Sequence, residues 1–500
     1  MTLQNRPTES SYWIYPNQLI AGSYPSDFSH ARTEMILDNF HTAGVRRILN
    51  LTVHGELENR ADSRIPYRCD PAKIQVRRCA IPAGSTPKPS DAMNMCRILH
   101  QWIGEGHAIY IHSIDGTARA AMIAAIYSGM RDALPGPKAL ERVREARKLA
   151  GFESEMELNP EQAQFVSTFL DAYRHHTHKL GPITEGERIR GALLGHAVGD
   201  ALGAGVAGLS ADEIRMRFSN GLSEMTEHSE RGLRAGETAE DTELPLILAE
   251  SYNSVGDFDI EDIDRRMKAW LRTGPRDLGG VTREVLSRSL DARDLFRVAQ
   301  DVLDEKGHRM VSGNGCLTRV APIGLVRAGD DRLLHETRIV CTMIQADSLC
   351  VETSQTFTTT LEAIVLGKSR VDVADSIRNF VYSFQPSIEK KLENWTRCPV
   401  RFGFSGGYTL DSLALSLQIF YHSSGFEDGL IEVVNRGGDT DTNAALSGAL
   451  LGAYYGESAI PSRWVDSLMN KSRILNAADG LLRVRRRELR QASTEPAPGT

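Results

Sequence analysis

The residues best suited to chemistry lie in one short run, Asn-Arg-Gly-Gly-Asp-Thr-Asp-Thr-Asn-Ala-Ala, at positions 435–445. Asp439, Asp441 and Thr442 offer the oxygen ligands that Mg²⁺ or Ca²⁺ prefers. The paired glycines before them can take positive φ and let a ligand approach the backbone. Small residues follow and predict a helix, whose N-terminus favours nearby carboxylates. The run therefore predicts a metal site, with an Asx-rich turn that caps the helix as the alternative.

The composition limits the class of protein to which this sequence belongs. The 500 residues predict two to four domains, and we expect two. Hydrophobic residues make up 41% and charged residues 25%, as in a soluble globular protein. The net charge of −7 argues against a nucleic-acid or anionic-membrane binder, because both need a positive field. The short basic run at 483–490 is therefore expected to be a solvated helix end rather than a nucleic-acid contact.

The cysteines and the apolar segments indicate the compartment. Seven scattered cysteines, with no Cys-x-x-Cys pair, predict neither a disulfide framework nor a zinc site. The first residues lack the apolar core of a signal peptide, and no run approaches the eighteen apolar residues of a membrane span. The longest apolar candidate, residues 120–130, is expected to be a buried helix. We therefore expect a cytoplasmic protein with no membrane partner.

Residues 12–173 alternate strand and helix patterns, which predicts an α/β domain. Ser90 is the expected N-cap of one of its helices. The expected strands lie at 45–53, 74–81 and 107–112, and the expected helices near 31–40 and 91–102.

The third strand runs into a loop at 113–119 that could hold an anion. A strand, a tight loop and a helix form the layout that cradles phosphate. Gly116 allows the turn, and the planar guanidinium of Arg119 can bind a phosphate through two hydrogen bonds. The loop resembles that of the tyrosine and dual-specificity phosphatases, whose signature is His-Cys, five residues, then Arg. Here Ser113 stands at the cysteine position.

The resemblance to phosphatases covers residues 12–173 but departs at two chemical positions. A serine hydroxyl is not ionised by the loop as a thiolate is. Ala83 stands where the resemblance implies a general-acid aspartate, whose loss costs a further ~10²–10⁴-fold. Ser113 and Arg119 are therefore expected to bind a phosphorylated ligand rather than to cleave it. A purely structural loop and residual catalysis are the alternatives.

The rest of the chain predicts a second domain. Polar residues with a Gly-Pro pair at 174–183 predict a linker, and residues 184–470 have helical periodicity almost throughout. Residues 471–500 are expected to form a helical end and a disordered tail from Ser493. Four glycines fall on nearly one helix face, which predicts close contact with a second helix. They are Gly191, Gly195, Gly199 and Gly203.

Residues 184–470 resemble the ADP-ribosylglycohydrolase family. The motifs that carry the resemblance stand in the family's order: Gly-Asp-Ala-Leu-Gly at 199–203, Gly-Asn-Gly-Cys-Leu-Thr-Arg-Val-Ala-Pro at 313–322, the run at 435–445, and Ile-Pro-Ser-Arg-Trp at 460–464. The resemblance implies a helical bundle with a centre of two Mg²⁺ ions and ADP-ribose, or an ADP-ribosylated protein or small molecule, as partner. The ligand-binding residues that it implies are Asp200, Gly313, Asn314, Gly315, Gly437 and Gly438.

The resemblance also implies a second metal cluster, at Ala-Glu-Asp-Thr in residues 239–242. Ala239 lacks the hydroxyl of the family's first threonine, and Glu240 reaches further than aspartate. Asp241 is retained. If the match to the family's motif shifts by one residue, Thr238 is an alternative ligand. With Asp439, Asp441 and Thr442, these carboxylates still suffice for at least one Mg²⁺. We expect Asp241, Asp439 and Asp441 to converge within ~4–8 Å.

Two further departures leave two functions open. Ala207 stands where the resemblance implies a glutamate near the scissile bond, and Gln345 replaces a histidine. Tyr408 either stacks on adenine or packs internally. Hydrolysis of an ADP-ribosyl bond passes through an oxocarbenium-like state, which a carboxylate and metal ions assist. The chain is thus expected to be a Mg²⁺-dependent hydrolase or, alternatively, a catalytically degenerate protein that binds ADP-ribose and phosphorylated ligands.

Overall fold

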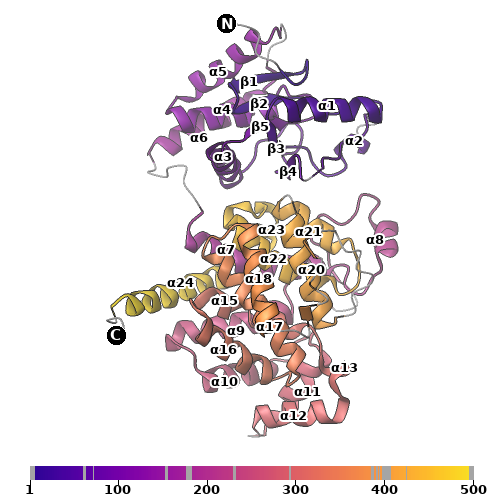
Figure 1. The fold of residues 1–500 in the computed structure, drawn as a ribbon, viewed down its shortest axis with the longest axis vertical. Coiled ribbons are helices and arrows are strands. Elements are labelled where there is room, and N and C mark those ends of the chain that lie inside the picture. Colours follow the sequence, from indigo (N-terminus) through magenta and orange to yellow (C-terminus); the bar gives the residue numbers. More distant parts are fainter. Residues whose placement is uncertain are drawn as a thin grey trace. The chain divides into compact units, whose positions relative to one another are not determined.

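The computed structural model divides into two compact units, Met1–Pro182 and Ile183–Thr500 (Figure 1). Most of the expected linker and the end of the expected tail lie outside the described residues. Helix α24 includes Ser493, so the tail does not begin there. The structure describes residues 6–59, 64–70, 72–152, 156–175, 183–228, 232–291, 294–384, 388–389, 392, 395–396, 407–423 and 425–494.

Unit 1 is built on a five-stranded sheet with the order β1-β2-β5-β3-β4. The strands β1 and β2 form an antiparallel hairpin, and the other neighbours are parallel. Parallel strands need crossover connections, which the helices supply. The elements up to β5 are β1 (Ser11–Tyr15), β2 (Leu19–Gly22), α1 (His30–Thr42), β3 (Val45–Asn50), α2 (Glu56–Asn59), β4 (Gln75–Arg78), α3 (Pro89–Gly104) and β5 (Ala108–His112).

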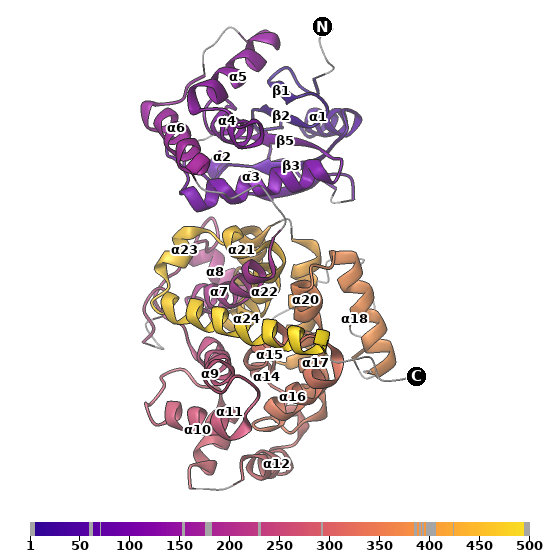
Figure 2. The same ribbon diagram turned by 90° about the vertical axis from the view of Figure 1, so that its left-hand side faces the viewer.

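Successive side chains of β5 point to opposite faces of the sheet, as in any strand. Ile109 and Ile111 join the core formed with α3, α4 (Arg119–Asp132), α5 (Gly136–Leu149) and α6 (Pro160–His175). Tyr110 instead packs with Phe40 of α1. Helices therefore cover both faces (Figure 2).

Two sequence predictions about these helices had different outcomes. Every residue from 120 to 130 is buried in α4, as predicted. The prediction that Ser90 caps α3 is wrong, because this helix begins at Pro89 and Lys88 is its N-cap. Proline is pre-organised for the first helical position, so it moves the start of the helix forward.

The described elements of unit 2 are all helices, and strand pairing occurs there only in isolated bridges. Its first elements are α7 (Glu185–Ala204), α8 (Ala211–Arg217), α9 (Glu240–Val255), α10 (Ile260–Leu271), α11 (Gly280–Ser289), α12 (Leu295–Lys306), α13 (His308–Val311), α14 (Gly315–Arg319) and α15 (Ala321–Val326). The others are α16 (Asp330–Thr342), α17 (Ser348–Val365), α18 (Arg370–Phe384), α20 (Thr409–His422), α21 (Phe426–Val434), α22 (Thr440–Tyr455), η2 (Glu457–Ala459), α23 (Ser462–Ser467) and α24 (Lys471–Thr494).

The helices α7 and α22 lie side by side at the centre of unit 2 and touch backbone to backbone (Figure 1). A β-carbon added at Gly195 would lie 2.2 Å from the carbonyl oxygen of Gly448, and one at Gly199 would lie 2.0 Å from that of Ala444. Gly191 and Gly203 stand equally close to α22, so the predicted close contact is confirmed. We call Gly191, Gly195, Gly199 and Gly203 with their partners on α22 the glycine ladder.

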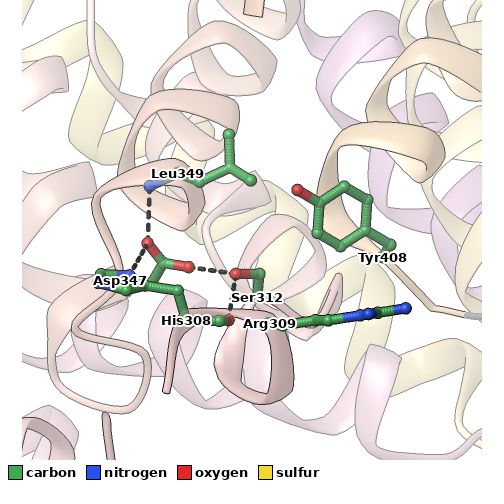
Figure 3. Close-up of a pocket in the computed structure, with 6 residues that line it drawn as sticks. All are labelled: His308, Arg309, Ser312, Asp347, Leu349 and Tyr408. Carbon is green, nitrogen blue, oxygen red and sulfur yellow. Dashed lines mark hydrogen bonds and ion pairs between the residues drawn. The ribbon is translucent and has the colours of Figure 1, made fainter. Parts of the chain in front are cut away.

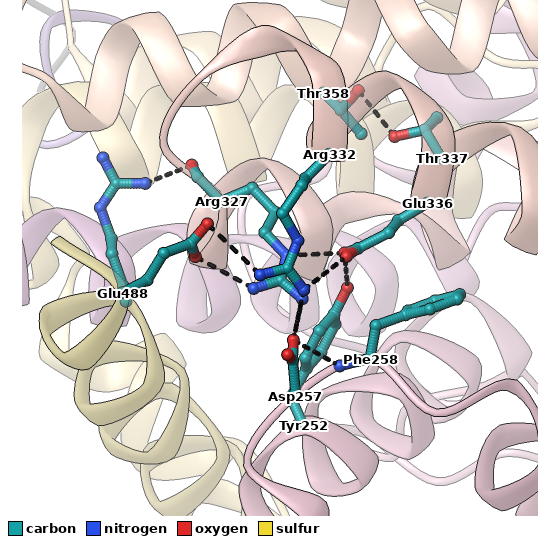
Figure 4. Close-up of polar contacts among 10 residues, drawn as sticks. Tyr252, Asp257, Phe258, Arg327, Arg332, Glu336, Thr337, Thr358 and Glu488 are labelled. Atoms are coloured by element: carbon teal, nitrogen blue, oxygen red, sulfur yellow. Dashed lines mark hydrogen bonds and ion pairs between the residues drawn. The ribbon is translucent and has the colours of Figure 1, made fainter. Parts of the chain in front are cut away.

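A buried arginine joins distant parts of unit 2 (Figure 4). Arg327, 2% exposed, donates to Glu336 Oε2 at 2.7 Å, Glu488 Oε2 at 3.0 Å and Asp257 Oδ1 at 2.5 Å. These carboxylates belong to α16, α24 and the connection between α9 and α10. The arginine therefore ties the last helix to the body of the unit.

The basic run at 483–490 is only partly the solvated helix end that was expected. Arg485 is fully buried, donates to Glu185 Oε1 at 2.7 Å and contacts the carbonyl oxygen of Arg327. Arg483 and Arg486 are exposed. The expectation is therefore wrong for Arg485, because α24 packs one face of this run against the unit.

Candidate active site

The glycine ladder brings the first turns of α22 and α9 together beside α7. Thr442 Oγ1 donates to Asp241 Oδ2 at 2.8 Å and lies 3.4 Å from Asp439 Oδ1. Asp241 and Asp439 thus share one hydroxyl group although about two hundred residues separate them. Asp441 is buried in the same first turn of α22 and repels the charge of Asp241.

Asp200 of α7 holds the start of α9 in place. Its Oδ2 accepts hydrogen bonds from Ala239 N at 3.1 Å and Thr242 Oγ1 at 2.6 Å. Its Oδ1 is buried and has no hydrogen-bond partner among the described residues. Burial raises the pKa of Asp200 to about 7, with the charge of Asp441 adding to the effect and the bond from Thr242 opposing it.

Glu240 takes a separate position at the edge of this carboxylate cluster. Its Oε2 accepts a hydrogen bond from Gly279 N at 2.6 Å, and its Oε1 would lie 3.7 Å from a β-carbon at Gly315. Burial raises its pKa to about 7. Burial also raises the pKa of Asp241 well above its usual value, together with the charges of Asp200 and Asp441. The cluster therefore consists of buried carboxylates whose negative charges repel one another.

The loop at 313–315 reaches the cluster through Asn314. Asn314 Nδ2 donates to Asp439 Oδ2 at 2.6 Å and to Ser412 Oγ at 2.9 Å. β-Carbons at Gly313 and Gly315 would meet other atoms no closer than 3.5 Å and 3.7 Å. Asn314 therefore orients one carboxylate, and the glycines beside it leave room for a ligand.

Two buried side chains support this loop from behind. Gln345 Nε2 donates to the carbonyl oxygens of Val311 at 2.9 Å and Gly313 at 2.7 Å. Its Oε1 accepts from Arg319 Nη2 at 2.6 Å, and Arg319 Nη1 donates to the carbonyl oxygen of Gly315 at 3.0 Å. The carbonyls on both sides of Asn314 are thus held by one Gln–Arg pair.

The paired glycines before Asp439 serve packing. Gly437 and Gly438 have φ of 75° and 84°. A β-carbon at Gly437 would lie 2.5 Å from the carbonyl oxygen of Leu209, and Gly438 N donates to that oxygen at 2.8 Å. The close neighbour of Gly437 is therefore protein backbone, where the sequence predicted the approach of a ligand.

A pocket of about 740 Å³ adjoins the loop (Figure 3). Tyr408 lies on one side, and Asp347 lies on the other, where it accepts from His308 Nδ1 and Leu349 N at 3.1 Å each. Tyr408 pairs with Gly313 in an isolated β-bridge, and the carbonyl oxygen of Ser312 accepts a hydrogen bond from Thr409 N at 3.1 Å. The lining residues are His308, Arg309, Ser312, Asp347, Leu349 and Tyr408.

Most of this pocket was not predicted. Tyr408 was singled out, and its ring is 38% exposed in the pocket. His308, Arg309 and Ser312 were missed, because no spacing marks them. Their position directly before Gly313 was the available signal.

The positions where the chain departs from the family pattern carry no substitute ligand. Ala207 and Ala239 are buried. The hydroxyl of Thr238 accepts a hydrogen bond from Asn470 Nδ2 at 2.9 Å, so a packing contact engages it.

The loop at 113–119 in unit 1 has the expected shape but an engaged arginine. Ser113 Oγ accepts a hydrogen bond from Gly116 N at 3.2 Å. Arg119, 4% exposed, donates to both carboxylate oxygens of Glu56 at 2.8 and 2.6 Å, and to the carbonyl oxygen of Ile81 at 2.8 Å. The carboxylate of Glu56 thus binds the guanidinium group that was expected to bind phosphate. Ala83 is exposed.

Among the described residues, no group of three or more His, Cys, Asp and Glu side chains is arranged to hold a metal ion. None of the helices in that part of the chain is both long and apolar enough to cross a membrane.

Comparison of unit 1 with solved structures gives only a weak likeness. The active form of Tk-PTP is 19% identical, with 32% of this chain and 97% of that chain covered and a TM-score of 0.27. The phosphatase resemblance of residues 12–173 therefore stays a prediction.

Unit 2 has clear relatives. The ADP-ribosyl-[dinitrogen reductase] glycohydrolase of Rhodospirillum rubrum is 29% identical over 288 residues, which cover 56% of this chain and 90% of that protein. The ADP-ribosylarginine hydrolase Tri1 of Serratia proteamaculans is 27% identical over 312 residues, covering 59% and 79%. A chain in the structure of an ADP-ribosylglycohydrolase-related protein complex is 30% identical, with 60% and 99% covered and a TM-score of 0.52.

The model of the ADP-ribosylglycohydrolase family matches residues 182–491, more than half of the chain. This range contains the carboxylate cluster, the loop at 313–315 and the pocket. The chain therefore belongs to the ADP-ribosylglycohydrolase family.

Proposed function

We propose that unit 2 hydrolyses the glycosidic bond of an ADP-ribosyl group with the help of Mg²⁺. One observation carries the proposal: Asp241, Thr442 and Asp439, from two helices, meet at one hydroxyl beside a pocket of about 740 Å³. The named relatives act on ADP-ribosylated dinitrogen reductase and ADP-ribosylarginine. An ADP-ribosylated protein side chain is accordingly the substrate class that we propose.

The residues present fit Mg²⁺ in their chemistry. The donors are all oxygen atoms, and Asp200 Oδ1 is buried without a partner among the described residues. Mg²⁺ keeps several waters and takes one or two carboxylates from a protein. Asp241, Asp439 and Thr442 would therefore hold one ion. Asp441 and Glu240 lie near enough for their charges to act on Asp241, and they would support a second ion. When bound, Mg²⁺ supplies positive charge that polarises water and the ribose hydroxyls.

The chain's own residues position the substrate around this centre. Asn314 fixes the carboxylate of Asp439, and Asp200 fixes the turn that carries Asp241. Tyr408 offers an aromatic face for the adenine base, and Arg309 offers a guanidinium for the pyrophosphate. Burial excludes bulk water from the carboxylates, so charge interactions there are strong.

The test is release of ADP-ribose from an arginine-ADP-ribosylated protein, with Mg²⁺ or with EDTA. We expect release that needs Mg²⁺ and falls at least ~10²-fold in Asp241→Asn and in Asp439→Asn. Asp212→Asn is the matched control, because this aspartate on α8 is 80% exposed. Release that persists unchanged in both site variants would disprove the assignment.

A second function is favoured by the absence of a carboxylate at Ala207. Without an acid or base near the scissile bond, the site would bind ADP-ribose and turn it over slowly or not at all. Calorimetric titration with ADP-ribose distinguishes the two functions. Binding that needs Asp439, without release from any ADP-ribosylated substrate, would establish the binding protein.

For unit 1 we propose anion binding without hydrolysis at residues 113–119. The Gly116 N–H that points to Ser113 Oγ supports this role, and the pairing of Arg119 with Glu56 limits its strength. Phosphate titration followed by NMR should show weak binding that Glu56→Gln strengthens. The absence of binding in both forms would favour a purely structural loop. The described cysteines are free thiols, which supports the proposed cytoplasmic location.

A further inference from the structure

Three buried cysteines that are distant in sequence meet directly behind the loop at 313–315. Cys316 lies in α14, Cys341 in α16 and Cys350 in α17, and all three are fully buried. Cys341 and Cys350 both lie near enough to Cys316 to act on its pKa. We call these three residues the thiol cluster.

Two members of the cluster contact the same carbonyl oxygen. Cys316 Sγ lies 3.3 Å from the carbonyl oxygen of Gly313, and Cys350 Sγ lies 3.8 Å from the same oxygen. Cys341 Sγ is directed elsewhere, 3.7 Å from the carbonyl oxygen of Gln345 and 3.8 Å from Ser354 Oγ. Cys316 and Cys350 therefore share a neighbour that Cys341 does not contact.

The pair lies one residue away from the pocket wall. Leu349, which lines the pocket, directly precedes Cys350 in the sequence. Ser312, which also lines it, directly precedes Gly313, whose carbonyl both sulfurs contact. The pocket wall and the pair are therefore linked through the backbone of these neighbouring residues.

The surroundings favour a reactive sulfur at Cys316. Burial raises the pKa of this thiol, but hydrogen bonds from Cys341, Cys350 and Thr409 and the charge of Arg319 outweigh burial and hold the pKa well below its usual range. The pKa of Cys350 is raised by its hydrogen bond to Cys316 and by burial. A thiolate beside thiols is the arrangement in which peroxide attack is followed by disulfide formation.

We propose that Cys316 and Cys350 form an oxidation site that a peroxide converts into a disulfide. The Cys316 thiolate attacks one peroxide oxygen, the O–O bond breaks, and the leaving hydroxide takes a proton. The Cys350 thiol then attacks the sulfenic sulfur, the S–S bond forms, the S–O bond breaks, and the proton of Cys350 leaves with the hydroxide as water. Two thiols are oxidised, and hydrogen peroxide is reduced to two waters.

The bond has a structural consequence for the candidate active site. A disulfide holds its sulfurs at about 2.05 Å, much closer than non-bonded thiols. Helix α14 begins directly after Asn314, so drawing Cys316 towards α17 moves the residue that binds Asp439. Oxidation should lower ADP-ribose release, and this consequence alone rests on the proposed function.

The experiment treats the full chain with hydrogen peroxide, alkylates it with N-ethylmaleimide under denaturing conditions and maps the cysteines by mass spectrometry. We expect two fewer alkylated cysteines, a linked peptide pair containing Cys316 and Cys350, and full reversal by dithiothreitol. Cys350→Ala should abolish the cross-link, and Cys341→Ser should retain it. The matched control is Cys96→Ser, which removes an equally buried thiol from α3 of unit 1 and should change nothing.

The wild-type mapping decides the proposal even where a variant fails to fold. Complete alkylation after peroxide, or a cross-link between any other two cysteines, would overturn it. A Cys316–Cys350 bond with unchanged ADP-ribose release would overturn only the link to Asn314. The thiol readout does not depend on hydrolysis, so its failure is distinguishable from failure of the proposed function.

Discussion

Gln345 shows how one side chain can serve a site that it does not line. Its amide donates to two carbonyl oxygens of the loop, and its own oxygen accepts from Arg319. An amide can do both, because it carries two donors and an acceptor. Gln345 therefore supports the loop that carries Asn314.

We predict that Gln345→Ala destabilises the protein by about 3 kcal/mol, because it removes two buried hydrogen bonds to carbonyl oxygens and the acceptor of Arg319 Nη2. Urea unfolding measures the change. Gln300→Ala on the exposed face of α12 is the control and should stay within ~0.5 kcal/mol. An equal, small effect in both variants would refute the role of Gln345 as a support.

His112 gives unit 1 a dependence on pH. The imidazole is fully buried, its Nε2 lies 2.8 Å from Tyr67 Oη, and burial lowers its pKa from 6.5 to about 3. The unfolded chain takes up a proton near pH 6.5 and the folded chain does not. Stability is therefore complete above pH 6.5 and is lost as the pH falls from 6.5 towards 3.

We predict that this loss amounts to about 2 kcal/mol between pH 7.5 and pH 5. The measurement is denaturant unfolding across this range for the wild type and His112→Asn, whose difference should shrink on acidification. His100→Asn, an exposed change on α3, should follow the wild type. A His112→Asn profile that parallels the wild type would contradict the prediction.

Some of these residues could be predicted from the sequence, and others could not. The acidic run at 439–442 was visible because its members are neighbours in the chain. Asp241 was found only through the family resemblance, since no spacing connects it to Asp439. The thiol cluster was hidden, because its members come from three helices and their sequence intervals carry no metal or disulfide pattern.

At the scale of elements, the site depends on the distance between α7 and α22. Their backbones touch along the glycine ladder, so the helix that carries Asp200 and the helix that carries Thr442 stand closer than ordinary side chains would permit. The spacing of four between the glycines predicted this contact correctly. Their partner helix could not be predicted from the spacing, because small residues recur elsewhere in the chain.

We predict that Gly452→Ala costs about 3 kcal/mol of stability, because its β-carbon would lie 1.9 Å from the carbonyl oxygen of Gly191. Thermal and urea unfolding measure the loss. Gly280→Ala is the matched control: this helical glycine of α11 has no atom within 4 Å of an added β-carbon, and the change should be neutral or gain up to about 1 kcal/mol. Comparable unfolding of the two variants would show that the backbone contact is not tight.

At the scale of the whole molecule, each unit has its own core, and unit 2 is closed by its last helix. Sequence periodicity identified the α/β and helical classes of the two units correctly. It did not identify the burial of Arg327 and Arg485, because a charged residue inside a helical pattern is ordinarily solvated. Only the assembled unit shows the carboxylates that pair with them.

We predict that Arg327→Ala costs about 3–5 kcal/mol, because the buried Glu336 loses its buried cation and keeps only the half-exposed Arg332 as an ion-pair partner. The double variant Arg327→Met with Glu336→Met should recover most of this loss. Arg332→Ala is the control; this arginine is 48% exposed and contacts the same acids, so we expect less than about 1 kcal/mol. Equal losses in the single and double variants, measured in guanidinium chloride, would rule out an uncompensated charge as the cause.

The repeat of the glycine ladder also has a kinetic consequence. A slip of α22 by one turn, about 5.4 Å, would set Gly195 against Gly452 and Gly199 against Gly448, so the slipped helices would still pack closely. The ladder fixes how near the helices lie but not their register. The register is specified by polar bonds at its end, where Thr440 Oγ1 donates to the carbonyl oxygen of Gly203 at 2.7 Å. We therefore expect the slipped packing to compete with the native register during folding, before the two halves of the site meet.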